Sequence, residues 1–147
     1  MSSTPQQLDR NGILAAAISN AMVGVLHAYT GRGPTRARTT IGDDLIVCVL
    51  ASTLTRGEQS LVRNGKQDVV LAGRRAYQET MEADAIGAIQ DLSGRRVVAF
   101  MSSNHIDPDL AVEVFILEPR QQATQDGDGN GARPDGERAL PWPGHGG

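Results

Sequence analysis

Apolar residues recur every three or four positions in two long stretches of the chain, which is the spacing of an amphipathic helix. The first stretch follows Asp9, and its apolar positions are Ile13, Leu14, Ile18, Ala21, Met22, Val25 and Tyr29. The second covers residues 66–92, and its stripe consists of Val70, Arg74, Tyr77, Met81, Ala85, Ile89 and Leu92. We therefore predict two long helices, the first ended by Gly31 and the second by Ser93-Gly94.

Four shorter stretches have the composition of β-strands. Residues 36–41 are rich in β-branched side chains, and residues 44–52 form a nearly continuous apolar run. Gly42-Asp43 supplies turn residues between them, so the two stretches predict a hairpin. Residues 96–102 and 111–118 predict a second hairpin around a loop at residues 104–109.

A short helix is predicted between the two hairpins. Thr55 and Glu58 have the three-residue spacing of a capping box, and Asn64-Gly65 ends the helix after Arg63. The elements then follow in the order α-β-β-α-α-β-β. This order predicts an α+β fold of two layers, a four-stranded antiparallel sheet of two hairpins with the first and third helices on one face.

The chain divides into three regions by composition. Residues 1–8 form a short polar, flexible N-terminus, and residues 9–119 form the α+β domain. Residues 120–147 contain seven Gly and three Pro, with Leu140 and Trp142 as the only large apolar side chains. This composition predicts a disordered tail, because it offers too little apolar surface to offset the entropy of ordering.

Charge and cysteine content narrow the class of protein. The net charge of -3 gives no global attraction to nucleic acid or to an anionic membrane, and Lys66 is the only Lys among 14 basic residues. Cys48 is the only cysteine and lies in an apolar run, so we expect a buried side chain and a reducing, cytoplasmic location. No signal peptide and no transmembrane segment of about 20 apolar residues is expected.

A basic loop at residues 31–38 is the first candidate site. Gly33 lies beside Arg32, and Arg36 and Arg38 point to the same side if the strand begins at Arg36. Guanidinium groups placed in this way can bind phosphate, carboxylate or an acidic partner surface. They can equally pair with acids of the chain itself, namely Asp43, Asp44 or Glu58.

The loop between the last two strands is the second candidate site. Asn104, His105 and Asp107 lie in it together with Asp109. A His with two carboxylates can hold a metal or move a proton, but Asp107-Pro108 also has the composition of an ordinary turn. The sequence shows no HxxxH or CxxC spacing and no nucleophile with a nearby base and acid, so no catalytic residue, metal or cofactor is predicted.

A nucleic-acid or nucleotide-binding module that uses the Arg-rich loop is an alternative function. The element order is similar to one variety of KH domain, but residues 63–66 between the adjacent helices contain one Gly where that domain needs GxxG. The glycines at 31 and 33 follow a helix, whereas a P-loop follows a strand. The nucleic-acid signal is therefore weak.

Four motifs together resemble one known family, the MpsC-like family, formerly a domain of unknown function. They are TGRGPTRARTTI at residues 30–41, DDLIVCVL at 43–50, LTRGEQSLV at 54–62 and FMSSNHIDPDLAVEVFILEP at 100–119. The family takes its name from a Na⁺-translocating, membrane-potential-generating system, in which it is the small soluble component beside an antiporter-like membrane subunit and a large soluble subunit. The resemblance covers residues 7–119 and carries no assigned catalytic residues.

The resemblance implies a bacterial, non-enzymatic accessory protein that docks onto transporter subunits. It also implies a cytoplasmic location, at the membrane only through a partner. The docking surfaces we expect are the Arg loop and the region of His105. A metal-dependent enzyme around His105, Asp107 and Asp109 is the second alternative. A homodimer is also expected if strand 36–41 or strand 111–118 lies at a free edge of the sheet.

Overall fold

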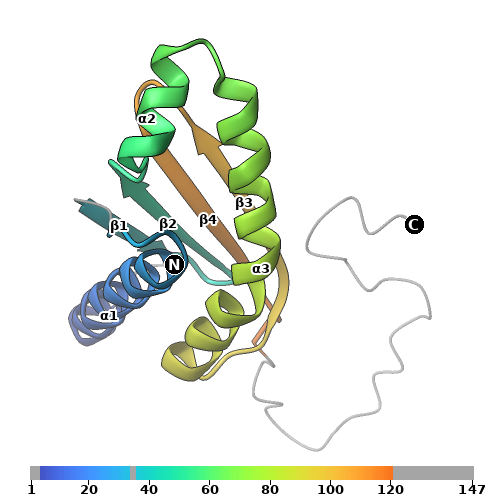
Figure 1. The fold of residues 1–147 in the computed structure, drawn as a ribbon. Coiled ribbons are helices and arrows are strands. Elements are labelled where there is room, and N and C mark those ends of the chain that lie inside the picture. The colour runs from blue at the N-terminus through green and yellow to red at the C-terminus, as the bar shows by residue number, and fades with distance from the viewer. Residues whose placement is uncertain (1–3, 34–35, 121–147) are drawn as a thin grey trace, which may run out of the picture.

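The computed structural model describes residues 4–33 and 36–120. Within them the chain forms an α+β fold with the predicted order of helices and strands (Figure 1). The elements are α1 (Pro5–Thr30), β1 (Arg36–Ile41), β2 (Leu45–Ala51), α2 (Arg56–Arg63), α3 (Gln67–Ser93), β3 (Val97–His105) and β4 (Leu110–Leu117). The predicted tail at residues 120–147 lies outside the described residues except for Arg120.

The helix ends follow local capping chemistry. The side chain of Thr4 accepts a hydrogen bond from the backbone N–H of Gln7, and Pro5 occupies the first turn, so α1 begins four residues before the predicted start at Asp9. Gly31 ends α1 with a left-handed φ of 74°, a conformation that glycine adopts without strain. The predicted capping box of α2 is present, with Thr55 and Glu58 bonding each other's backbone N–H.

The sheet has the antiparallel strand order β1-β2-β4-β3. β1 is an edge strand, as predicted, but the expectation of a free edge at residues 111–118 is wrong, because β4 pairs with both β2 and β3. The predicted loop at residues 104–109 is also too long. Asn104 and His105 continue β3, because they pair with Ala111 and Leu110 of β4.

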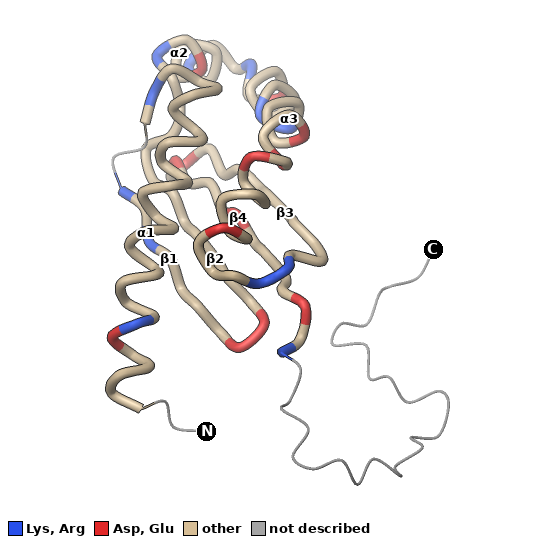
Figure 2. The backbone as a smooth tube through the Cα atoms, turned by 90° about the horizontal axis from the view of Figure 1, so that it is seen from below, with Lys and Arg blue, Asp and Glu red and all other residues tan. Residues whose placement is uncertain are grey.

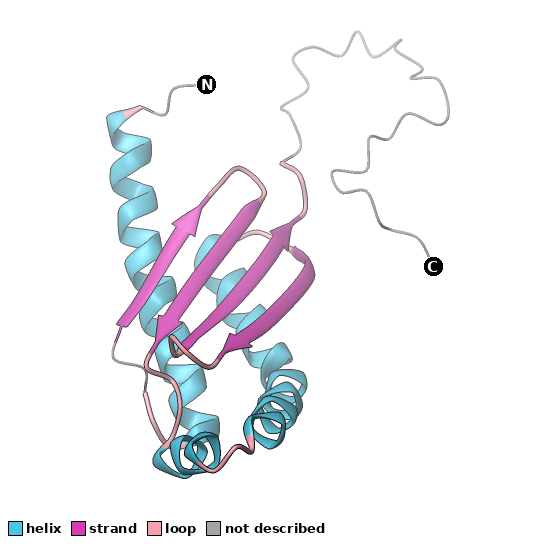
Figure 3. Ribbon diagram, turned by 90° about the horizontal axis from the view of Figure 1, so that it is seen from above, coloured by secondary structure: helices cyan, strands magenta, loops and turns pink. Residues whose placement is uncertain are grey.

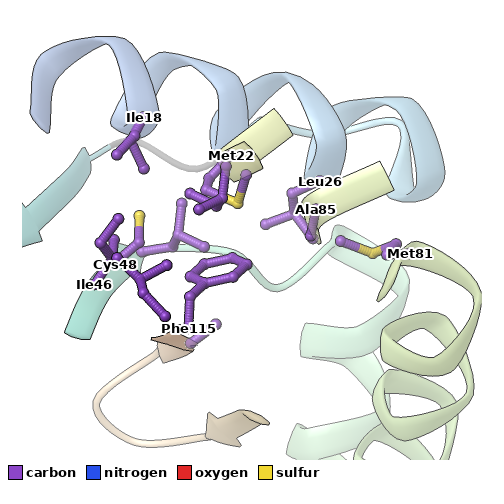
Figure 4. Close-up of a cluster of buried hydrophobic side chains, with 12 residues drawn as sticks. Ile18, Met22, Leu26, Ile46, Cys48, Met81, Ala85 and Phe115 are labelled. Atoms are coloured by element: carbon purple, nitrogen blue, oxygen red, sulfur yellow. The ribbon is translucent and has the colours of Figure 1, made fainter. Parts of the chain in front are cut away.

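Helices α1 and α3 lie side by side on one face of the sheet and bury a single apolar core (Figures 1 and 3). Buried side chains of α1, α3 and the central strands β2 and β4 meet between the helices and the sheet (Figure 4). They include Ile18, Met22 and Leu26 of α1, Ile46, Cys48 and Leu50 of β2, Met81, Ala85 and Ile89 of α3, and Ala111, Phe115 and Leu117 of β4. Burial raises the pKa of the Cys48 thiol, so this cysteine serves as a buried apolar side chain, as predicted.

Among the described helices, α1 is long and apolar enough to cross a membrane by length and composition. The same helix supplies core residues, and its Ser19 hydroxyl shares a hydrogen bond with the Thr39 hydroxyl of β1 at 2.8 Å. Core helices pass the same length and composition test. The expectation that the chain has no transmembrane segment stays a prediction.

Candidate functional site: the open face of the sheet

The sheet has a second face, called here the open face, that no described helix covers (Figure 3). Thr39 of β1 bonds to α1, so its neighbours Arg38 and Thr40 point to the opposite side. Arg38 pairs with Val49, Val49 with Val112, and Val112 with Ser103. Directly paired residues share a face, so these four positions form one row across the open face.

The two central strands present aliphatic side chains on the open face. These residues are the half-buried Leu45, Val47 and Val49 of β2 and Leu110, Val112 and Val114 of β4. Ile116 of β4 lies on the same side of the strand but is only 5% exposed. Strands that face water on one side usually alternate apolar with polar residues, whereas strands covered on both faces read as continuous apolar runs. Met101 of the edge strand β3 joins the aliphatic area and is 54% exposed. The open face therefore has the composition of a surface that another element covers.

The open face contains a hollow of about 250 Å³ near the start of β4. We call it the β3–β4 hollow, and its lining includes Val49, Leu110, Val112, Ser103 and His105. Three of these side chains are aliphatic, and the Ser and His lie on the outer strand. The hollow therefore suits an apolar side chain with a polar group at one margin.

The ionisable groups at open-face strand positions are all basic. Arg36 and Arg38 are exposed on β1, and His105 is exposed on β3 at the opposite edge. Neither Arg has an ion-pair partner among the described residues. Figure 2 shows the basic start of β1 and the acidic β1–β2 turn at opposite ends of the strand. In the described part of the chain, Arg36 and Arg38 are therefore not paired with Asp43, Asp44 or Glu58, and Glu58 pairs with Arg74 instead.

The structure brings three of the predicted site residues onto one face and places the others elsewhere. Arg36, Arg38 and His105 share the open face, whereas Asn104 pairs with the buried Ala111 and points to the helix side. Asn104 and Ala111 also border the β3–β4 hollow. Arg32 and Gly33 lie just after α1, and a Cβ on Gly33 would stand 3.6 Å from the Val23 side chain. Asp107 is exposed in the β3–β4 turn. Residues 34–35 of the Arg loop lie outside the described residues.

The carboxylate of Asp109 has a structural role. It accepts hydrogen bonds from the Thr53 backbone N–H and hydroxyl, both at 3.0 Å, and from the Leu54 backbone N–H at 2.9 Å. His105 Nδ1 lies 2.8 Å from the Pro108 carbonyl oxygen. The described residues contain no group of three or more His, Cys, Asp or Glu placed to hold a metal. Nothing in this geometry favours a metal centre at His105.

Two buried charged residues were missed as functional candidates. Arg74, 2% exposed, donates to both carboxylate oxygens of Glu58 at 2.6 and 2.7 Å and to the Thr53 carbonyl. Glu113 faces the helices between Met22, Leu50, Met81 and Phe100, and its Oε2 has no hydrogen-bond partner among residues 4–33 and 36–120.

Burial raises the pKa of Glu113 to about 7, although Ser102 and the charge of Arg74 act in the opposite direction. The sequence signals were an Arg within the apolar stripe of α3 and a Glu within an otherwise apolar strand.

Comparison with known proteins places this fold in a family. Residues 10–119 match the family model described as Na⁺-translocating membrane potential-generating system (MpsC). The uncharacterised protein YrhF of Bacillus subtilis (strain 168) is 27% identical over 90 residues, which cover 60% of this chain and 74% of YrhF. No solved structure matches the chain. Because the family model spans every described strand and nearly all of α1, the chain belongs to the MpsC family, as its motifs indicated.

Proposed function

We propose that this chain is a non-enzymatic accessory protein of the Na⁺-translocating membrane potential-generating system and that it acts by docking onto another protein. The family description supplies the system. The observation that carries the docking role is the aliphatic open face, which spans both central strands and lacks a covering helix in the described chain. Large apolar patches with a polar rim are typical of protein interaction sites.

The chemistry of the described side chains supports a role without catalysis. Cys48 is fully buried. His105 bonds to a backbone carbonyl, and no Ser, Thr or Cys side chain bonds to it or to His27 among the described residues. A nucleophile, a base and an orienting acid are therefore not assembled in this part of the chain. We place the protein in the cytoplasm, reaching the membrane through the partner that it binds.

The proposal is tested by capturing the tagged full chain from native membranes at physiological salt. We expect membrane subunits of the ion-translocating system to be recovered with it. A matched variant with Val49→Asp, checked for folding by circular dichroism, should lose them because a charge now lies in the aliphatic face. If the unaltered chain recovers no transporter subunit, the proposal is wrong.

A second candidate function, anion or nucleic-acid binding, has one supporting observation. Arg36 and Arg38 lie on the same face and have no acidic partner among the described residues. Phosphate contacts make affinity fall as salt rises. Titration with single-stranded and duplex nucleic acid at two salt concentrations tests this candidate, and absence of binding at both removes it.

A further inference from the structure

We infer that the occupant of the open face is an acidic amphipathic helix of another polypeptide. Its apolar stripe would lie on β2 and β4, and its carboxylates would bind Arg36 and Arg38. This inference rests on the proposed docking function and specifies the chemistry of the partner. Three features of the open face support it, namely the aliphatic centre, the β3–β4 hollow and ionisable groups that are all basic.

The dimensions of the face fit one helix. An α-helix with its side chains is about 10–12 Å across, and neighbouring strands lie about 4.8 Å apart. A helix lying over the central strands β2 and β4 therefore places one flank over β1 and the other over β3. One apolar side chain of its stripe can enter the β3–β4 hollow, where Val49 and Val112 form the apolar wall.

The charge of the open face indicates which side chains lie beside the apolar stripe of the bound helix. Arg36 and Arg38 are two residues apart on one strand, so their Cα atoms are about 7 Å apart. Acidic residues one helical turn apart lie at a similar separation, about 5–6 Å between Cβ atoms. A flank with Glu or Asp at three- or four-residue spacing can therefore meet both guanidinium groups, and carboxylate–Arg contacts are strong and directional.

A second copy of this chain fits the open face less well. The strand positions on this face include two Arg and one His but no Asp or Glu. Two open faces packed together would bury like charges against each other or against aliphatic side chains, which opposes association. A lipid surface also fits poorly, because the valines of β2 and β4 are half-buried within the sheet and cannot insert into a bilayer.

The test uses two designed 18-residue helical peptides with the same Leu stripe, one with Glu on the flanks and one with Lys. Binding to the full chain is measured by fluorescence anisotropy at low and physiological salt. We expect the Glu peptide to bind at least tenfold more tightly than the Lys peptide. The double variant Arg36→Glu, Arg38→Glu should weaken binding of the Glu peptide at least tenfold and strengthen binding of the Lys peptide. The matched control Arg75→Glu, on the exposed surface of α3, should change neither affinity.

Several outcomes would overturn the inference. They are equal binding of both peptides, binding of neither, or the same effect from Arg75→Glu as from the double variant. Arg-dependent binding to anionic phosphatidylserine vesicles without peptide binding would make lipid the occupant. A dimer in sedimentation that the double variant dissociates would make it a second copy.

Different experimental results would contradict the proposed function and the inference. If membrane capture recovers transporter subunits equally well with Arg36→Glu, Arg38→Glu, the inference is wrong and the docking role remains. If the Glu peptide binds as expected but no transporter subunit is captured, the face has the inferred chemistry and the proposed function is wrong.

Discussion

At the scale of single residues, the buried Glu113 links stability to pH. Its pKa of about 7 in the fold lies above the ordinary value of 4.5. Between these pH values the folded state holds a proton that the unfolded state has released, so the free energy of unfolding falls as pH rises. The shift corresponds to a loss of roughly 3 kcal/mol across this window. We predict that Glu113→Gln removes this loss and is more stable than the unaltered protein at pH 8.

Urea unfolding at pH 5 and pH 8 measures this difference, and the two proteins should be of nearly equal stability at pH 5. Glu118→Gln is the matched control, because Glu118 is exposed just beyond the same strand. A pH dependence that survives in Glu113→Gln would show that another group is responsible.

The pair Arg74 and Glu58 predicts the opposite response to acid. Burial acts to raise the pKa of Glu58, but hydrogen bonds from Arg74 and Thr55 and the charge of Arg74 lower it overall. The stabilisation is present above the ordinary pKa and is lost as pH falls through the lowered value. Arg74→Met leaves Glu58 without its cation and should cost about 3–5 kcal/mol at pH 7. Thermal and urea unfolding beside the exposed control Arg75→Met check this, and a cost equal to the control's contradicts it.

At the scale of elements, Asp109 joins the β3–β4 turn to the connection between β2 and α2. Its three hydrogen bonds hold Thr53 and Leu54 in place. Asp109→Ala leaves the Leu54 N–H and Thr53 groups unpaired and should cost about 2–4 kcal/mol. Amide hydrogen exchange should accelerate at Thr53 and Leu54 but stay unchanged in the core of β2. Asp107→Ala, an exposed residue of the same turn, is the control, and equal effects of the two changes would refute the role of Asp109.

Elements set by local chemistry were predictable, whereas those set by distant pairing were not. The spacing of Thr55 and Glu58 located α2, and turn residues located the hairpin of β1 and β2. The extension of β3 to His105 depends on its pairing with Leu110, and the central place of β4 depends on β2. The pairing of β4 with β2 joins segments far apart in the sequence and is not visible in a short window. Leu110 lies only five residues after His105, and that extension was missed because the turn composition of Asp107-Pro108 predicted a longer loop.

The candidate site also combines features that local sequence predicts with features that only the fold reveals. Strand alternation put Arg36 and Arg38 on one side in advance, because that relation is local. The position of His105 on the same face follows only once β3 includes it. The ion pair of Arg74 with Glu58 joins two helices, so the apolar stripe of α3 gave its burial but not its partner.

At the scale of the whole molecule, the helices cover one face of the sheet and leave the other open. Neighbouring residues of a central strand therefore differ in burial. Ile46 is fully buried against the helices, whereas Val47 lies half-buried on the open face. Ile46→Thr removes buried carbon atoms and places a hydroxyl in the core, which should cost roughly 3 kcal/mol or more. Val47→Thr keeps the shape of the side chain, and its hydroxyl can hydrogen-bond to water on the open face, so it should cost under about 1 kcal/mol.

The variants Ile46→Thr and Val47→Thr also distinguish an effect on stability from an effect on docking. Because the partner would cover Val47, Val47→Thr should weaken capture of membrane subunits while leaving the unfolding midpoint nearly unchanged. Chemical unfolding and membrane capture on both variants provide the measurement. If Val47→Thr destabilises the isolated chain as strongly as Ile46→Thr, then some part of the protein itself covers the open face. That result would remove the structural basis of docking there, since a face already buried within the chain has no aliphatic surface to offer another polypeptide.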